Sequence, residues 1–452
     1  MSPAGDGVRP EEVLEALLRR ARKTGAAEAE VYVAKTSSLA VAAKGGVIDQ
    51  VRRHDEFSAA LRLIDQGRLG FAHTSVFSPA ALDETAARAA AGFESTDPQP
   101  GLGLPGPPAG PWPVVEGPDL TASAVPLEEK MAAVLEMERV ALAADSRVER
   151  VRTAEYREGS GAVWLANSLG LVYSHAGTVF SGTLTVKAVE HDQAEMGGWG
   201  EFSRKYKELD LRAIGREAAL RAVMGLGGIK VKTYKGPVIL ENSVMASFIG
   251  VLAGSFPADG VRKGKSLLAG KLGEKIAAEE IDLADDGLWP GGIAASPADG
   301  EGVPRRRTAL IKDGVLQGFL YDVTHARLDG RESTGNAVRG LKSPPGIGVT
   351  NLVLQPGKDS LEQLQARLGE GLLVADVLGV HTANPITGNF SLGCSGFWIK
   401  NGRILHPVKG MALAGNLLSL LTRTVALGSD ARKFGAISVP SALVDGLTVS
   451  GL

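Results

Sequence analysis

The histidines are the side chains in this chain best suited to bind a metal ion. A zinc peptidase site on a helix needs two imidazoles about one turn apart, and a carboxylate beside them to take a proton from zinc-bound water. The seven histidines are His54, His73, His175, His191, His325, His381 and His406. No two of them lie within one or two helical turns of each other. The sequence therefore excludes a helical pair of zinc ligands.

The single cysteine, Cys394, is a second candidate for chemistry. Flanked by His381 and His406, it could be a thiol nucleophile with a base. A reactive thiol needs surroundings that lower its pKa, and the sequence shows none. The small residues around it favour close strand packing, so we interpret Cys394 as a small buried residue. One cysteine also excludes an internal disulfide and suits a reducing compartment.

Two segments resemble the sequence motifs of phosphate-binding loops but lack other features that those loops require. The run from Gly101 to Gly106 reads G-x-G-x-x-G, but it has no strand before it and no helix after it. Gly264-Lys265-Ser266 resembles the end of a Walker A loop, yet the first glycine of that loop would have to be Asp259. We predict a linker for the first and a solvated basic loop for the second.

Charged clusters have a functional and a structural interpretation. An acidic group could bind a hard cation, but it lacks the spacing of a Ca²⁺ loop, and a solvated strand edge is commoner. Its members are Glu279, Glu280, Asp282, Asp285 and Asp286. Arg305, the first of three consecutive arginines, could contact a peptide carboxylate or an acidic partner. Protection of a strand edge by charge explains these arginines equally well.

The segment from Gly388 to Gly396 is our candidate for contact with a substrate or partner. Glycine-rich strands let another backbone approach, as the addition of an extended peptide to a sheet requires. The candidate contact residues in it are Gly388, Asn389, Ser391 and Gly393. The alternative is a sheet edge closed by the protein's own chain.

A hairpin follows this segment. The apolar-rich runs 397–400 and 403–406 are joined by Asn401-Gly402, whose residues tolerate the positive φ of a type I′ turn. With residues 412–417, this region closely resembles the C-terminal signature of the TldD/PmbA family, a pair of related bacterial proteins linked to peptide processing. Further matches run through the chain at 26–31, 301–303, 311–314, 333–335 and 350–352.

The resemblance predicts where a metal site would lie. TldD-type subunits carry H-E-x-x-x-H on a helix of the C-terminal domain, where two imidazoles hold zinc. Anchored on Pro237–Leu240 and Gly264–Ser266, the motif positions fall on Gly250, Val251 and Ser255. Because none of these residues can replace an imidazole or the carboxylate, the chain resembles the PmbA-type subunit, also called TldE, which lacks the metal site.

This resemblance implies a non-catalytic subunit with no cofactor of its own. It would pair with a TldD-type subunit that holds the zinc, and act on unfolded peptides. Alone, the chain could form a homodimer. Two alternatives stay open: a peptidase with a metal held by His381, His406 and Asp376, and a scaffold homodimer without proteolysis.

Composition narrows the class of protein. The 452 residues include 49 basic and 51 acidic ones, a formal net charge of −2, so no basic excess exists for nucleic-acid binding. Residues Met1–Pro10 show no secretory signal, and the longest apolar run, Val244–Ala253, is about half of the ~20 residues that a bilayer requires. We expect a soluble, cytoplasmic protein.

The elements expected along the chain indicate an α+β fold with extensive, partly irregular antiparallel sheet. Helices are expected at 10–24, from Ser78-Pro79, along a stripe from Leu127 to Leu142, and from Asp210 to about Gly225. Short strands are expected at 28–35, 39–44, 47–51, 57–64, 162–165, 171–175 and 179–189.

Domain boundaries follow from these elements and from one proline- and glycine-rich stretch. Between Pro98 and Pro113, Pro or Gly fills 11 of 16 positions, which indicates a linker or an extended surface loop. We predict an N-terminal α+β module at 1–96, a linker at 97–126, a central α+β region at 127–230 and a β-rich C-terminal domain at 231–452.

Overall fold

The computed structural model describes residues 7–451 of the chain. The prediction that Met1–Pro10 contains no secretory signal therefore falls largely outside the described residues. Among the residues that are described, none of the helices combines the length and apolar character that crossing a bilayer demands. The architecture is mixed, with helices and several antiparallel sheets, which confirms the predicted α+β class.

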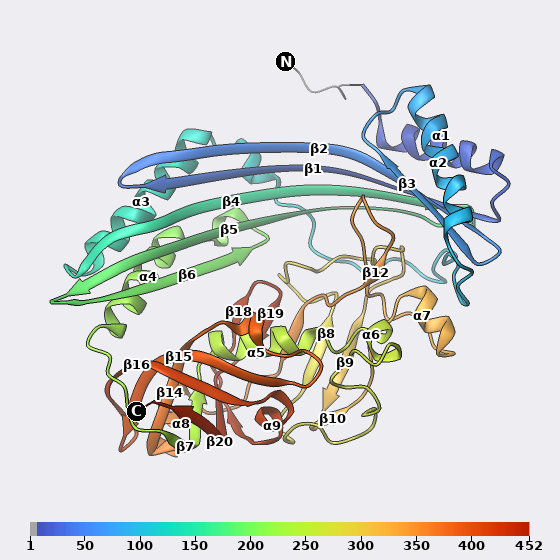
Figure 1. Ribbon diagram of the computed structural model, residues 1–452. Helices are drawn as coiled ribbons and strands as arrows, with labels where there is room; N and C mark the ends of the chain where they lie inside the picture. The colour runs from blue at the N-terminus through green and yellow to red at the C-terminus, as the bar shows by residue number, and fades with distance from the viewer. Residues whose placement is uncertain (1–6, 452) are drawn as a thin grey trace.

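A long antiparallel sheet forms the first layer, and in Figure 1 it arches over the rest of the molecule. Its strand order is β3-β2-β1-β4-β5-β6. The strands are β1 (Glu28–Lys44), β2 (Val47–Asp65), β3 (Arg68–Thr74), β4 (Val148–Asn167), β5 (Val172–Glu190) and β6 (Gln193–Ser203). At about 3.4 Å per residue, β1 and β2 each span roughly 60 Å. Strands from the predicted N-terminal module and central region therefore share one sheet.

The prediction of several short strands here was wrong. Runs 28–35 and 39–44 are both part of β1, and runs 47–51 and 57–64 are both part of β2. The polar stretch Thr36-Ser37-Ser38 interrupts the apolar alternation but not the strand, because β1 is paired with β2 and β4 on both sides there. Apolar residues alternate along a strand only where one face of the sheet is buried. Both faces are poorly covered at this point, so the alternation is absent although the strand continues.

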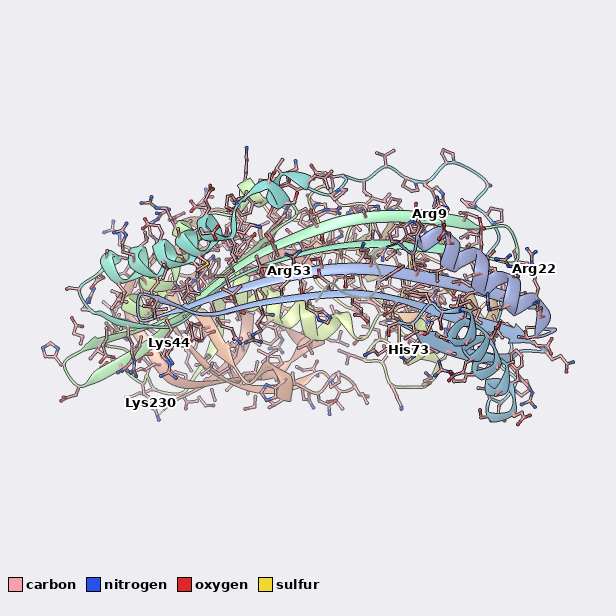
Figure 2. The ribbon with its side chains drawn as sticks, turned by 90° about the horizontal axis from the view of Figure 1, so that it is seen from above. Arg9, Arg22, Lys44, Arg53, His73 and Lys230 are labelled. Atoms are coloured by element: carbon pink, nitrogen blue, oxygen red, sulfur yellow. The ribbon has the colours of Figure 1, made fainter. Side chains whose placement is uncertain are left out.

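Four helices cover one face of this sheet, near its two ends. They are α1 (Pro10–Lys23), α2 (Pro79–Ala91), α3 (Leu127–Ala144) and α4 (Leu211–Gly225). The predicted caps are confirmed: Ser78 accepts from the Ala81 N–H, and Asp210 from the Ala213 N–H. Figure 2 shows α1 and α2 at one end of the long strands and α3 at the other.

Each helix pair has its own hydrophobic core. Leu17 of α1 packs with Val31, Val33, Leu61 and Leu63 at one end of the sheet. At the other end, α3 and α4 pack on a separate cluster that includes Met137, Ile214, Tyr156, Phe180 and Leu184. The middle of the sheet, between these cores, carries small and polar residues.

The predicted linker contains one short helical turn, η2 (Leu120–Ala124), and otherwise no helix or strand. Even so, it is held firmly against the folded parts. Leu104 is fully buried, and its N–H donates to the Glu28 carboxylate at 2.6 Å. Arg327 donates to the Leu104 carbonyl at 2.9 Å. This segment therefore connects the first sheet to the C-terminal part.

Two further six-stranded sheets build the C-terminal part, in the orders β10-β9-β8-β13-β19-β18 and β16-β15-β14-β7-β20-β17. The first contains β8 (Leu283–Asp286), β9 (Arg307–Lys312), β10 (Val315–Leu316), β13 (Leu352–Leu354), β18 (Arg432–Phe434) and β19 (Ile437–Val439). The second contains β7 (Tyr234–Leu240), β14 (Glu370–Leu378), β15 (Asn389–Lys400), β16 (Arg403–Asn416), β17 (Thr424–Leu427) and β20 (Ala442–Ser450). A small pair, β11 (Ala337–Val338) and β12 (Gly346–Ile347), stands apart.

The second of these sheets closes on itself, because β16 also pairs with β20. The turn between β15 and β16 is the predicted one, with Asn401 at φ 53° and Gly402 at φ 69°. The remaining helices are α5 (Asn242–Ala253), α6 (Ala258–Arg262), α7 (Val323–Leu328), α8 (Leu361–Leu368) and α9 (Leu417–Thr422). The apolar side chains of α5 lie in the largest hydrophobic core.

Buried ion pairs hold the first sheet on the C-terminal part. Arg62 of β2 donates to Glu30 of β1 at 3.1 Å and to Glu301 at 2.9 Å. Arg339 contacts the other oxygen of Glu30 at 2.5 Å and lies 4.5 Å from the centre of the Tyr32 ring. These side chains are almost fully buried, so the network joins the two parts of the chain rigidly.

Candidate functional site

The helix expected to carry a metal motif is α5, and its motif positions lack metal ligands. Gly250 is exposed on the last full turn, and Val251 follows it, half-buried. The helix ends at Ala253 and Gly254 caps it, so Ser255 lies beyond the helical ladder. Ser255 is 1% exposed, and its hydroxyl has no hydrogen-bond partner among the described residues. These positions offer one hydroxyl, which does not fit zinc.

The Walker-like Gly264-Lys265-Ser266 lies beside this helix end. The Ser266 hydroxyl donates to the Ser255 carbonyl at 2.6 Å and accepts from the Leu268 N–H at 3.0 Å. Lys265 is exposed. Because the serine hydroxyl is occupied in holding a turn, it is unavailable to a magnesium-bound phosphate, as the interpretation of a basic loop predicts.

The alternative metal ligands do not form a site. His381 is exposed in the helical turn η4 (Val380–Thr382), whereas the His406 ring contacts the Pro407 carbonyl at 3.0 Å. Asp376 of β14 lies opposite Ser395 in the register, and burial raises the pKa of its carboxyl. Between residues 7 and 451, no group of three or more His, Cys, Asp or Glu side chains is arranged to hold a metal ion.

Cys394 is buried between neighbouring strands, opposite Val377 and Met411. Burial raises the pKa of its thiol to about 12, and the nearby charge of Asp376 adds to the effect. A thiol in this environment stays protonated and is a poor nucleophile. The structure thus agrees with the interpretation of Cys394 as a small buried residue.

Residues 389–396 of the predicted segment belong to β15, where exposed and buried residues alternate, whereas Gly388 precedes the strand and is buried. Asn389, Ser391 and Gly393 are exposed, and Phe390, Leu392 and Cys394 between them are buried. From Gly393 to Gly396 the strand is paired with both β14 and β16. A peptide therefore cannot add as a further strand along that stretch. Between Asn389 and Leu392 the strand is paired with β16 and not with β14, so contact with a substrate would use this stretch or the exposed side chains of the same face.

Arg305 lies in another part of the fold. Its Nε donates to the Ala298 carbonyl at 3.1 Å, and Asp299, Asp285 and Tyr173 are near enough to influence its charge. Burial lowers the pKa of its guanidinium. The structure thus places Arg305 in the C-terminal part, half-buried, and does not bring it to the β15 segment.

The acidic group is also used internally. Asp285 is buried and accepts from Thr350 and Asn336, and burial raises the pKa of its carboxyl. Asp282 pairs with Lys312 at 2.5 Å, and Asp286 lies 3.8 Å from Arg307. Asp282 and Asp286 therefore connect the β8 region to β9, Asp285 holds the segments at Asn336 and Thr350, and Glu279 and Glu280 are exposed.

A large cavity lies where the middle of the first sheet is bare. It has a volume of about 1310 Å³ and is lined by the central parts of β1, β2, β4 and β5, by residues between 118 and 127, and by Lys342. Small residues open this space: nothing lies within 4 Å of where a Cβ on Gly159 would be. The volume exceeds the ~300–1,000 Å³ of ordinary small-molecule pockets, so it suits a segment of extended chain.

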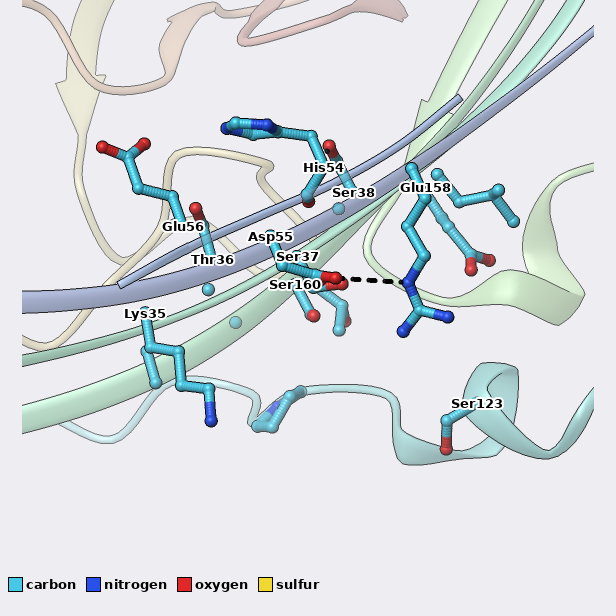
Figure 3. Close-up of a pocket in the computed structure, with 18 of the residues that line it drawn as sticks. Lys35, Thr36, Ser37, Ser38, His54, Asp55, Glu56, Ser123, Glu158 and Ser160 are labelled. Atoms are coloured by element: carbon cyan, nitrogen blue, oxygen red, sulfur yellow. Dashed lines mark hydrogen bonds and ion pairs between the residues drawn. The ribbon is translucent and has the colours of Figure 1, made fainter. Parts of the chain in front are cut away.

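The polar groups of the cavity are drawn in Figure 3. Asp55 lies 3.4 Å from Arg53, and a hydrogen bond from Ser37, more than this ion pair, holds the pKa of its carboxyl below the usual value. Ser38 donates to the main-chain carbonyl of His54, not to its ring. With no hydroxyl directed at an imidazole among these residues, the cavity has the character of a binding surface rather than a catalytic centre.

Sequence reasoning missed this cavity. The signal that could have found it is the run of small polar residues in adjacent strands, Thr36-Ser37-Ser38 in β1 and Gly159-Ser160-Gly161 in β4, which pair with each other. In the sequence these residues looked like breaks between strands. In the sheet they lie side by side across the middle of the strands, where few side chains from other elements pack on either face.

Three family models match the chain. They describe the PmbA/TldA metallopeptidase domain 1 at residues 29–92, its central domain at 121–226 and its C-terminal domain at 233–451. Together the matches cover most of the sequence, on both sides of the glycine- and proline-rich segment.

Individual relatives agree with these models. The chain is 28% identical to the metalloprotease PmbA of Escherichia coli O157:H7, over 94% of this chain and 92% of that protein. A putative modulator of a DNA gyrase from Thermotoga maritima superposes with a TM-score of 0.90 at 28% identity, over 97% of this chain and all of the other. TldE from Thermococcus kodakarensis superposes with a TM-score of 0.88 at 25% identity, over 97% and 100%.

Proposed function

The chain belongs to the PmbA/TldD family of metallopeptidases, and from this premise we propose that it is a TldE-type subunit that has no catalytic site of its own. In this proposal it pairs with a TldD-type subunit, which holds the zinc, and the two together act on unfolded peptides. Its place of action would be the cytoplasm, whose reducing conditions suit a chain with a single cysteine.

One observation carries the proposal: the end of α5, where the family's metal motif aligns, offers Gly250, Val251 and Ser255. Zinc catalysis needs ligands that fix the ion and a base for its water, and these three residues supply neither. No step of a reaction is therefore assigned to this chain.

The physical role left to such a subunit is to enclose the substrate. Two related subunits can surround a cleft about a pseudo-twofold axis, and one competent site within it is sufficient. A closed cleft excludes water and holds an unfolded peptide near the metal. The cavity of about 1310 Å³ in the first sheet and the exposed face of β15 are the surfaces that this chain would contribute.

The test compares three samples on an unstructured peptide: this chain alone, a TldD-type relative alone, and the mixture. We expect cleavage only where the TldD-type relative is present, faster cleavage in the mixture, and co-elution of the two chains on gel filtration. Zinc, measured by atomic absorption, should follow the TldD-type chain.

Peptide cleavage by this chain alone, together with stoichiometric zinc and loss of activity on chelation, would overturn the proposal. So would a mixture in which the two chains neither co-elute nor change the rate of cleavage. A TldD-type relative whose H-E-x-x-x-H glutamate is replaced by glutamine is the matched control, because it should still bind this chain while cleaving nothing.

A further inference from the structure

Strand β2 has a free edge over half of its length. Its neighbour β3 pairs with it only from Ala59 to Asp65. Between Val47 and Ser58, no strand among residues 7–451 pairs with the other side of β2, and Figure 1 shows it as the outermost strand there. Every second residue of such an edge directs its N–H and C=O away from the sheet, so this stretch is a template for another strand.

The order of side chains along this edge is complementary to itself. His54 is at the centre, with Arg53 and Asp55 on either side of it and then Arg52 and Glu56. The next residues outward are both apolar, Val51 and Phe57. Reading away from His54 in one direction gives positive charges, and in the other direction negative ones.

Symmetry turns this order into a specific register. When two copies of one strand pair edge to edge about a twofold axis perpendicular to the sheet, the faces of the sheet are kept, so one residue lies opposite itself. With His54 on the axis, Arg53 of each copy lies opposite Asp55 of the other, and Arg52 lies opposite Glu56. The neighbouring allowed registers would place Arg53 opposite Arg53, or Asp55 opposite Asp55.

The shape of the edge has the same centre. Asp49 is skipped in the register between β1 and β2, which is a β-bulge, and a bulge bends its strand. At the other end, pairing with β3 begins at Ala59. Asp49 and Ala59 are both five residues from His54. The stretch Gln50–Ser58, which is free of the bulge and unpaired on its outer side, is therefore symmetric about His54, and the bulge bends the hairpin tip where the β3 of another copy would begin.

We propose that a second copy of this chain adds to β2 in antiparallel fashion along Gln50–Ser58, with His54 on the twofold axis. The association joins two six-stranded sheets into one continuous sheet. It goes beyond the function proposed above, since it needs no other kind of subunit. The opposite charges on both faces favour this partner over an arbitrary strand, because like charges directly opposite each other destabilise a sheet.

A cysteine on the axis provides the first test. In His54→Cys, the two introduced thiols lie directly opposite each other, about 5 Å apart at Cβ. Mild oxidation or a short bis-maleimide should give a covalent dimer in high yield at low protein concentration. The only native cysteine, Cys394, is buried. The control is Lys44→Cys, which is also exposed but lies at the hairpin tip, far from its own copy.

A charge exchange provides the second test. Sedimentation equilibrium should give a dimer for the native chain and, for Arg53→Glu, a dissociation constant about tenfold higher, because two attractive pairs become repulsive. The double variant Arg53→Glu with Asp55→Arg restores complementarity and should restore the dimer. Lys44→Glu changes the net charge equally and should have no effect.

Either of two results would overturn the proposal. The first is a native chain that stays monomeric at every concentration measured. The second is a dimer that is indifferent to Arg53→Glu and in which His54→Cys cross-links no better than Lys44→Cys. Circular dichroism of each variant distinguishes loss of association from loss of folding.

Discussion

Glu30 of β1 and Arg62 of β2 lie directly opposite each other in the first sheet, joined at 3.1 Å, and their side chains are 0% and 3% exposed. Burial alone would raise the pKa of Glu30, but the guanidinium groups of Arg339 and Arg62 outweigh it and hold the pKa below its usual value. Since Arg62 also binds Glu301, a cross-strand pair of one layer is part of the attachment between layers.

Removing Arg62 should therefore destabilise the whole protein. In Arg62→Ala, two buried carboxylates lose a partner, and breaking such a pair costs about 3–5 kcal/mol. Urea denaturation followed by circular dichroism measures the loss. Arg19→Ala, on the exposed side of α1, is the control and should stay within about 0.5 kcal/mol of the native chain. Equal stability of the two variants would contradict the role given to the network.

Asp299 should make stability depend on pH. Its carboxylate accepts the N–H groups of Glu301, Val303 and Ala337, yet burial, helped by the charge of Glu301, raises its pKa to about 7. In the unfolded chain the pKa is about 3.9. The folded state thus binds more protons between about pH 4 and 7, so the contribution of Asp299 to stability falls as the pH rises through this window.

Comparison of Asp299→Asn with the native chain isolates this effect. The variant cannot ionise, so the stability of the native chain relative to the variant should decline from pH 5 to pH 8. Urea midpoints at four pH values give this difference. A difference that is constant with pH would show that Asp299 is ionised throughout.

Cys394 should be inert in the folded protein. With a pKa of about 12, only about one thiol in ten thousand is ionised at pH 8. Ellman's reagent should react fully in 6 M guanidinium chloride and only slowly, through opening of the fold, in buffer. An introduced cysteine in Lys44→Cys, which is exposed, should react at once and so verifies the reagent. Rapid modification of native Cys394 would mean that the strand pairing around it is not intact.

Gly250 and Ser255, the positions that align with the two histidines of H-E-x-x-x-H, should differ in how much stability a histidine costs. Ser255 is almost fully buried, so Ser255→His overfills its site at a cost of about 1–3 kcal/mol. Gly250 is exposed, and the nearest atom to an added Cβ is Ile437 Cδ1 at 3.6 Å, so Gly250→His should leave the unfolding temperature nearly unchanged. If both substitutions were harmless, the end of α5 would have room for a ligand pair.

The local signals in the sequence predicted much of the fold. Caps at Ser78 and Asp210 and the turn at Asn401-Gly402 depend on neighbouring residues only, and they appear where expected. Continuity of β1 could not be predicted in the same way, because its middle is held by pairing with β4, from a distant part of the sequence. The cavity was missed for the same reason, since its walls come from four strands and a connecting segment.

The sequence could predict which metal ligands the candidate site lacks, but it could not predict how the remaining residues are arranged. Missing imidazoles can be read from the sequence alone. The surroundings of Arg305 could not, because a run of three arginines does not reveal that the first turns inward to Ala298 while Arg306 and Arg307 are exposed. Burial of a charged side chain depends on the packing of distant segments.

The pairing of β1 with β4 also sets an order of events during synthesis. Ser37 pairs with Ser160, 123 residues further along the chain (160 − 37 = 123). The edge of β1 that pairs with β4 therefore stays unpaired until the ribosome has made the intervening residues. Until then, a nascent chain displays two unsatisfied β edges instead of one. Slow translation between these strands would prolong that exposure and, with it, the time during which an open edge can pair with another chain.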